Sequence, residues 1–316
     1  MITIGWNNGL ELRANGTKIL IDPKRTDRGV PVLLTHGHSD HIPRDVKNPN
    51  SRIYATHPTV SLLTRFYGAP PESITPLSFN ETLVLEDIKI TPFVAGHIVG
   101  SAMYLIEVDG RRILYTGDVN PRGGLHVEGP ADVPEADVVI IESTYGSPEY
   151  RFPDPYKVRA ELVKWAVDLV RSGEKVLIKA YTVGKAQEVI STFNRLTNAE
   201  VVAVGEAAEA SSILARYSRL KFSLRDDGPC VIVTNRTNLV NTDRKAIVTG
   251  WVLKKRFYGF RGFCLSSHGD FYDLIDVIRR ASPQAVYTVH GMVETLASYV
   301  RREMGIRAEP LRMVRI

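Results

Sequence analysis

The sequence has few of the features that mark a secreted or membrane-spanning chain. Its 316 residues include two cysteines, Cys230 and Cys264, both inside apolar runs, and so few thiols argue against a disulfide framework. There is no run of about eighteen consecutive apolar residues, and residues 1–16 lack a basic segment followed by an apolar one. We therefore expect a reduced, cytoplasmic protein without a membrane partner.

Linkers, repeats and a strong charge of one sign are also missing. No Gly/Ser-rich linker or low-complexity tract occurs, so any second domain must be an insertion continuous with the first. Forty Lys and Arg against 35 Asp and Glu give a formal net charge of +5. This small excess is compatible with an anionic polymer as partner but does not require one.

What the chain does have is a dense group of metal-ligand side chains in Thr35–His41, with the sequence THGHSDH. It directly follows a short apolar run, as a loop follows a strand. Histidine nitrogens and carboxylate oxygens suit zinc, and the small spacers let alternate side chains turn toward two adjacent points. We predict that His36 and His38 face one ion while Asp40 and His41 face a second.

This stretch resembles the HxHxDH signature of the metallo-β-lactamase superfamily. The resemblance implies an α/β fold, the αββα sandwich, with one or two metal ions at a sheet edge. It does not imply a substrate, because lactamases, thioesterases, lactonases, oxidoreductases and nucleases share the fold. It adds three ligands, His97, Asp118 as the bridge between the ions, and His290. Two Zn²⁺ are the expected cofactors, with Mn²⁺ as a substitute.

Two polar residues outside the motif have open interpretations. Asp22 ends an apolar strand before Pro23, where it either hydrogen-bonds a ligand histidine and fixes its tautomer or simply forms a turn. His57 opens an expected helix, and this position favours a loop or capping residue over a ligand.

Two later motifs indicate which branch of the superfamily the chain resembles. Glu142–Gly146, ESTYG, resembles a motif of the β-CASP nucleases, and residues 147–153 resemble the short nucleases associated with DNA ligase and helicase genes and archaeal RNA 3′-end processing factors. The stretch SSHGD around His268 resembles the β-CASP motif whose histidine faces the leaving group. The resemblance implies His268 as general acid, Glu142 as its orienting partner, and Asp40 as both ligand and catalytic residue. A ligase or helicase partner follows from the same resemblance.

The segment between these motifs predicts an inserted α/β unit. Residues 156–172 have helical periodicity, a strand-like run follows, and a second helix begins after Thr182. This order resembles the opening of a β-CASP insertion, but one well below the usual size. We expect metallo-β-lactamase parts at 1–150 and 263–316, and a reduced β-CASP-like insertion at 151–262.

Candidate nucleic-acid contacts lie in this insertion. Lys185 stands at a helix start, where a phosphate could bind, although plain packing is the alternative. Lys254, Lys255, Arg256 and Tyr258 interleave charge with aromatic rings, as in a surface that holds phosphates and bases, although a solvated loop would look similar.

Together these residues favour a two-zinc phosphodiesterase, a nuclease and more narrowly an exonuclease, that hydrolyses RNA or single-stranded DNA in processing or repair. The resemblance implies a metal-bridged hydroxide as nucleophile. Two alternatives remain. One is a small-molecule ester or thioester hydrolase of the same fold. The other is a non-catalytic nucleic-acid-binding scaffold, which missing ligands would mark, and no ligand is missing.

Overall fold

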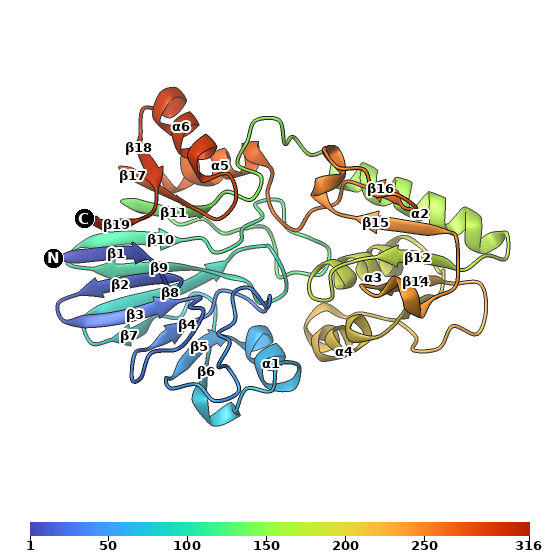
Figure 1. Ribbon diagram of the computed structural model, residues 1–316, viewed down its shortest axis with the longest axis horizontal. Coiled ribbons are helices and arrows are strands. Elements are labelled where there is room, and N and C mark those ends of the chain that lie inside the picture. Colours follow the sequence, from blue (N-terminus) through green and yellow to red (C-terminus); the bar gives the residue numbers. More distant parts are fainter. The chain divides into compact units, whose positions relative to one another are not determined.

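The computed structural model describes residues 1–316, and the chain forms two compact units, drawn with their elements labelled in Figure 1. Unit 1 comprises Met1–Gly123, Glu128–Tyr150 and His268–Ile316, and unit 2 comprises Gly124–Val127 and Arg151–Ser267. Apart from the short segment Gly124–Val127, unit 2 begins at Arg151 and ends at Ser267, and Phe263 and Leu265 are buried in its hydrophobic core. The domain boundaries expected from the sequence, at residues 150 and 262, stay predictions.

Unit 1 contains two seven-stranded sheets. Across the first sheet the strands are β19 (Met313–Arg315), β1 (Ile2–Trp6), β2 (Leu10–Ala14), β3 (Thr17–Ile21), β4 (Val32–Leu33), β5 (Ile53–Thr56) and β6 (Ile74–Leu77). Across the second they are β18 (Arg307–Pro310), β17 (Ala285–Val289), β11 (Val138–Glu142), β10 (Arg111–Tyr115), β9 (Ala102–Val108), β8 (Ile88–Val94) and β7 (Leu83–Leu85).

The two sheets of unit 1 pack face to face with helices outside. One cluster joins buried residues of both sheets, among them Ile4 of β1 and Ile106 of β9. The other face of the second sheet packs against α5 (Phe271–Ala281) and α6 (Val293–Met304), and α1 (His57–Arg65) packs against the other face of the first. Alternation of buried side chains along each strand produces these layers. The order helix, sheet, sheet, helix confirms the αββα expectation.

Parallel pairing in the second sheet gathers polar groups at one edge. β10 pairs in parallel with β11, and β11 in parallel with β17. Asp118 follows β10, Glu142 ends β11 and His290 follows β17. Because the carboxyl ends of parallel neighbours lie at the same edge of a sheet, these side chains are neighbours although the chain separates them widely.

Unit 2 is built on a five-stranded sheet in which every pairing is parallel. In order, its strands are β13 (Val201–Ala203), β14 (Val231–Thr234), β12 (Val176–Lys179), β15 (Lys245–Val248) and β16 (Arg261–Phe263). Its helices are α2 (Pro155–Arg171), α3 (Lys185–Leu196) and α4 (Glu206–Ser218). α2 begins where Asp154 accepts a hydrogen bond from the Tyr156 N–H, an N-cap followed by proline.

A short strap, Gly124–Val127, belongs to unit 2 although the sequence around it belongs to unit 1. Its Leu125 N–H and His126 Nδ1 both contact Glu188 of α3, at 2.7 and 2.8 Å. Arg195 and Ser218 donate to the carbonyls of Leu125 and His126. No sequence pattern marked this segment. No helix in either unit combines the length and apolar character that a membrane crossing needs.

Candidate metal centre

Three imidazoles and one carboxylate converge at the sheet edge of unit 1. His38 Nδ1 lies 3.1 Å from His36 Nε2 and 3.1 Å from His97 Nε2. Asp118 Oδ2 lies 3.5 Å from both Nε2 atoms. Ligands held about 2.0–2.1 Å from a tetrahedral zinc ion are separated from one another by roughly 3.3–3.4 Å. The observed separations fit a single cation at the centre of this group.

Glycines allow the loops that carry these ligands to approach. Gly96 has φ +71, and a side chain there would overlap the carbonyl oxygen of Asn120. Gly117 has φ +50, and a Cβ atom there would lie 2.8 Å from Thr35. Each glycine directly precedes a predicted ligand, so the missing side chain lets His97 and Asp118 reach the centre.

Asp22 orients the loop after β4. Its carboxylate accepts hydrogen bonds from the Thr35 N–H at 2.8 Å and the Thr35 hydroxyl at 2.6 Å, and it contacts His41 Nδ1 at 2.9 Å. His41 Nε2 then faces Asp118, 3.5 Å from Oδ1. Asp22 thus makes the hydrogen bond to a histidine that the sequence allowed, and the role of His41 as a metal ligand stays a prediction.

The electrostatics of the centre suit a cation. Burial and the neighbouring imidazoles hold the pKa of His36 well below its usual value, so this histidine is neutral, as a metal ligand must be. Burial alone would lower the pKa of His41, but the carboxylates of Asp118 and Asp22 raise it to about 10. The field at this position therefore favours positive charge.

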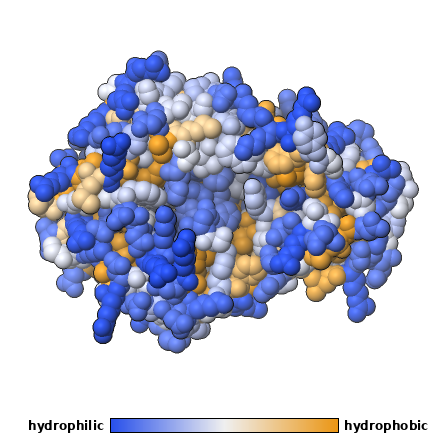
Figure 2. Space-filling view, in the orientation of Figure 1, coloured by the Kyte–Doolittle hydropathy of each residue, from blue (hydrophilic) through white to orange (hydrophobic).

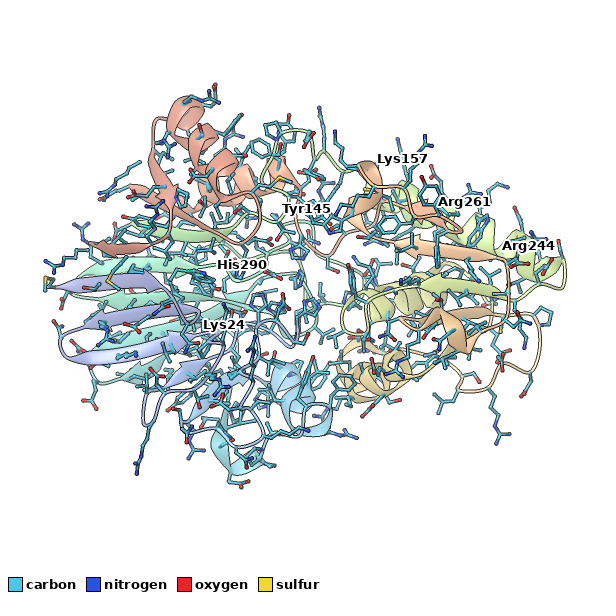
Figure 3. All side chains as sticks on the ribbon, viewed as in Figure 1. Lys24, Tyr145, Lys157, Arg244, Arg261 and His290 are labelled. Carbon is cyan, nitrogen blue, oxygen red and sulfur yellow. The ribbon has the colours of Figure 1, made fainter.

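The remaining predicted ligands, Asp40 and His290, lie near His41. Asp40 Oδ2 lies 4.0 Å from His41 Nε2, and the side chain of Asp40 is 78% exposed. The ring centroids of His41 and His290 are 5.4 Å apart. His290 has φ +53, its carbonyl accepts a hydrogen bond from Ser143, and the Trp6 ring packs edge-on against its imidazole at 4.9 Å. Figure 3 labels His290 in unit 1.

Glu142, which is buried, and His268, which is partly buried, form a pair beside the centre. His268 Nδ1 lies 2.9 and 3.0 Å from the two carboxylate oxygens of Glu142, which also accepts from the Val119 N–H. His268 Nε2 lies 3.9 Å from Asp118 Oδ2. Burial would raise the pKa of Glu142, but the charge and hydrogen bond of His268 lower it. The pair fixes Nε2 as the ring atom that faces the metal ligands.

The loop that carries His268 is held by residues that the sequence did not single out. Arg122 donates to Asp270 at 2.8 Å and to Asp273 at 2.9 Å. Asp270 also caps α5 by accepting from the Tyr272 and Asp273 N–H groups. The spacing of Asp270 and Asp273 is that of a capping box, a local signal that could have found them. Trp6 and Ser143, which contact His290, had no such signal.

The predicted nucleic-acid contacts all lie in unit 2. Lys185 is 4% exposed, its ammonium has no hydrogen-bond partner, and burial lowers its pKa to about 7. Lys254, Lys255, Arg256 and Tyr258 are exposed between a short 3₁₀ turn, Gly250–Leu253, and β16. Contact with nucleic acid remains a prediction for all five.

Two family models match the chain. Residues 6–178 match the beta-lactamase superfamily domain, and residues 263–309 match the Zn-dependent metallo-hydrolase RNA specificity domain. The second match contains His268 and His290. The first contains the other predicted ligands and Glu142.

Several curated proteins are similar in sequence. An RNase J-like protein of Methanocaldococcus jannaschii is 34% identical over 220 residues, 62% of this chain and 52% of that protein. A "Probable DNA ligase" of Opitutus terrae is 26% identical over 310 residues, 88% of this chain and 30% of that protein. Ribonuclease TTHA0252 of Thermus thermophilus is 30% identical over 248 residues, 70% of this chain and 55% of that protein. The chain thus spans about half, or less, of the length of these relatives.

A solved structure supports the fold over the whole length. The crystal structure of a protein of unknown function from Enterococcus faecalis V583 superposes with a TM-score of 0.71 at 14% identity, covering 99% of each chain. At this identity the likeness speaks for the fold alone. With a family model over more than half of its residues, this chain belongs to the metallo-β-lactamase superfamily.

Proposed function

We propose that this protein is a metal-dependent phosphodiesterase, a nuclease that hydrolyses RNA or single-stranded DNA, with exonuclease action as the expected mode. The observation that carries the proposal is the Glu142 and His268 pair beside the converging ligands. Hydrolysis of a phosphodiester needs a proton donor for the departing oxygen. The match of residues 263–309 to an RNA specificity domain and the two relatives named as a ribonuclease or RNase J-like support the same class.

The donor set fits zinc. His36, His38 and His97 would hold one ion, Asp40, His41 and His290 a second, and Asp118 would contact both, with Mn²⁺ as a substitute. Bound there, the metal would act as a Lewis acid that activates water and offsets charge on the phosphoryl oxygens. Seven ligands for two ions leave open coordination positions, which catalytic sites need and structural sites lack.

The side chains of the chain have separate tasks in this proposal. His268 donates its Nε2 proton to the departing oxygen, while Glu142 accepts the Nδ1 hydrogen bond and stabilises the charged ring. Asp22 fixes the tautomer of His41 through Nδ1, so that Nε2 remains the ligand atom. The hydrogen bonds of Arg122 to Asp270 and Asp273 keep the His268 loop in place.

A link to ligation is favoured by one observation. In the Opitutus terrae relative named "Probable DNA ligase", a region similar to 88% of this chain makes up 30% of one longer protein. We therefore include single-stranded DNA ends as substrates, trimmed before sealing, and a ligase as partner. Preference for RNA over DNA would argue against this link while leaving the nuclease proposal intact.

The test compares wild type, His268→Ala and His57→Ala on matched 5′-labelled and 3′-labelled oligomers of RNA and single-stranded DNA, with zinc and with manganese. His57 is exposed on α1, so its substitution is the matched control. We expect the wild type and the control to release products and His268→Ala to lose that activity. Intact oligomers together with robust ester or thioester hydrolysis would establish the small-molecule alternative. Intact oligomers and no bound zinc would establish the scaffold.

A further inference from the structure

A groove in unit 2 gathers unpaired positive charge. It has a volume of about 720 Å³ and lies between the start of α2 and residues 252–264. Its four cationic residues are Lys157, Lys255, Arg256 and Arg261, against a single acid, Glu161. None of the four cations forms a salt bridge in the structure. Figure 3 shows Lys157 and Arg261 at the start of α2 and on β16, while Arg244 lies elsewhere in the unit.

Aromatic rings line the same groove. They are Phe257, Tyr258, Phe260 and Phe263. Tyr258 is 91% exposed, so one face of its ring is open to a ligand. A ring with so little protein contact contributes little to the stability of the fold, whereas an exposed ring is well suited to stacking against a base. Apolar residues, orange in Figure 2, interrupt the hydrophilic surface of the molecule.

Two cations of this region, Lys255 and Arg261, form cation–π contacts with aromatic side chains. The Arg261 guanidinium lies 5.3 Å from the Phe263 ring centroid and 5.9 Å from that of Trp165. The Lys255 ammonium lies 4.8 Å from the Trp251 centroid. Cation–π contacts position these charges without neutralising them. Each charge is therefore held in place and remains available to an anion.

We propose that this groove binds single-stranded nucleic acid, with phosphates against Lys157, Lys255, Arg256 and Arg261 and a base stacked on Tyr258. The inference deepens the proposed function and rests on it for its biological meaning. A duplex hides the faces of its bases, and an acidic polypeptide has no planar group for Tyr258, so a single strand uses both features of the groove. Because every base has a stackable face, the groove binds RNA and DNA alike.

The test measures binding to the full-length protein in the presence of a chelator, so that no cleavage occurs. Fluorescence anisotropy is recorded with 12-residue oligo-U, 12-residue oligo-dT and a duplex of equal length over a range of salt. The charge variant is Lys157→Gln with Arg256→Gln. Its control is Lys221→Gln with Arg225→Gln, two exposed cations of unit 2 outside the groove. Circular dichroism melts check that each variant folds.

We expect the charge variant to lower the slope of log affinity against log salt by about 1.4, since each phosphate contact with a single strand contributes about 0.7. The control should leave the slope of the wild type unchanged. Tyr258→Ala should weaken oligomer binding by about tenfold, and Tyr258→Phe should restore it, because stacking needs the ring and not the hydroxyl. Leu224→Ala, an exposed apolar residue outside the groove, is the control.

Equal slopes for the charge variant and its control would overturn the proposal, as would duplex binding as tight as that of oligo-dT. Failure here is distinct from failure of the proposed function. If the protein cleaves oligomers and the groove variants change nothing, the nuclease proposal stands and the groove proposal fails. If binding depends on the groove but the protein cleaves no oligomer, the groove proposal stands and the nuclease proposal fails.

Discussion

The two units place their functional groups in different ways. Unit 1 positions ligands directly after β4, β10 and β17, where the hydrogen-bonded ladder fixes each strand end. The groove of unit 2 takes its cations from the start of α2, from the segment before β16 and from β16 itself, an edge strand. Metal coordination needs ligand atoms placed within tenths of an ångström, whereas holding a flexible polymer needs charge and rings with some freedom. The four variants below compare the metal centre of unit 1 with the buried charges of unit 2.

The largest stability effect is expected in unit 2. Glu188 accepts from Arg159 at 2.8 Å and contacts His126 at 2.8 Å, all three side chains being buried. Glu188→Gln would leave the Arg159 charge without compensation, so the free energy of unfolding should fall by about 3–5 kcal/mol. Urea denaturation at pH 7 measures this change.

The same variant has a pH signature. Burial would raise the pKa of Glu188, but His126 and Arg159 lower it to about 2, below the ordinary value of 4.5. The wild-type contribution is therefore complete above about pH 4.5 and is lost as the pH falls toward 2. Glu188→Gln should flatten this part of the stability profile. An unchanged profile would mean that the carboxylate does not hold the strap.

In unit 1 the strongest effect is expected on metal binding. Asp118→Asn keeps the shape of the side chain but removes the charge that lies 3.5 Å from three imidazole nitrogens. Zinc affinity should fall by more than about 100-fold, because loss of residues that merely support ligands already costs 10–100-fold. Titration against a competing chelator measures it. Retention of wild-type affinity would remove Asp118 from the ligand set.

A smaller effect should follow from Asp22→Asn. The amide can no longer accept from the Thr35 and His41 groups at once, so His41 loses its fixed tautomer. We expect zinc affinity to fall by about 10–100-fold. Asp27→Asn, in the same stretch of unit 1 but on the surface near Lys18, should leave zinc affinity as it is.

The smallest effect is expected from the buried amine of unit 2. The pKa of Lys185 is lowered by burial to about 7 from 10.5. Between these pH values the unfolded chain holds a proton that the folded chain lacks, so stability rises with pH there. Lys185→Met should raise the unfolding free energy at pH 7 by about 1–2 kcal/mol and remove this rise. Urea denaturation of both proteins at pH 7 and 9.5 measures this. If the unfolding free energy of Lys185→Met still rises between these pH values, Lys185 is not the group responsible.

The sequence was most informative where a function depends on strand ends. The candidate ligands after β4 could be named because a group of histidines and a carboxylate directly after an apolar run is a local pattern, whereas Asp118 after β10 was named through the family resemblance. Packing between distant segments has no local pattern, so the support of His290 by Trp6, the burial of Lys185 and the strap stayed unseen. The groove was not predictable either, because it brings together Lys157 and Arg261, which are far apart in the sequence. Only the basic segment before β16 was visible in advance.

The strap Gly124–Val127 limits how unit 2 can be exchanged between proteins. If unit 2 were inserted at a single point, it could be cut out between Tyr150 and His268 and replaced by another domain. Here that excision would take away Glu188, Arg195 and Ser218, the hydrogen-bond partners of Leu125 and His126. Five residues separate Asp118 from Gly124, so the loosened segment would begin close in sequence to a predicted metal ligand. Recombination that preserves the metal centre must therefore transfer the strap and unit 2 together.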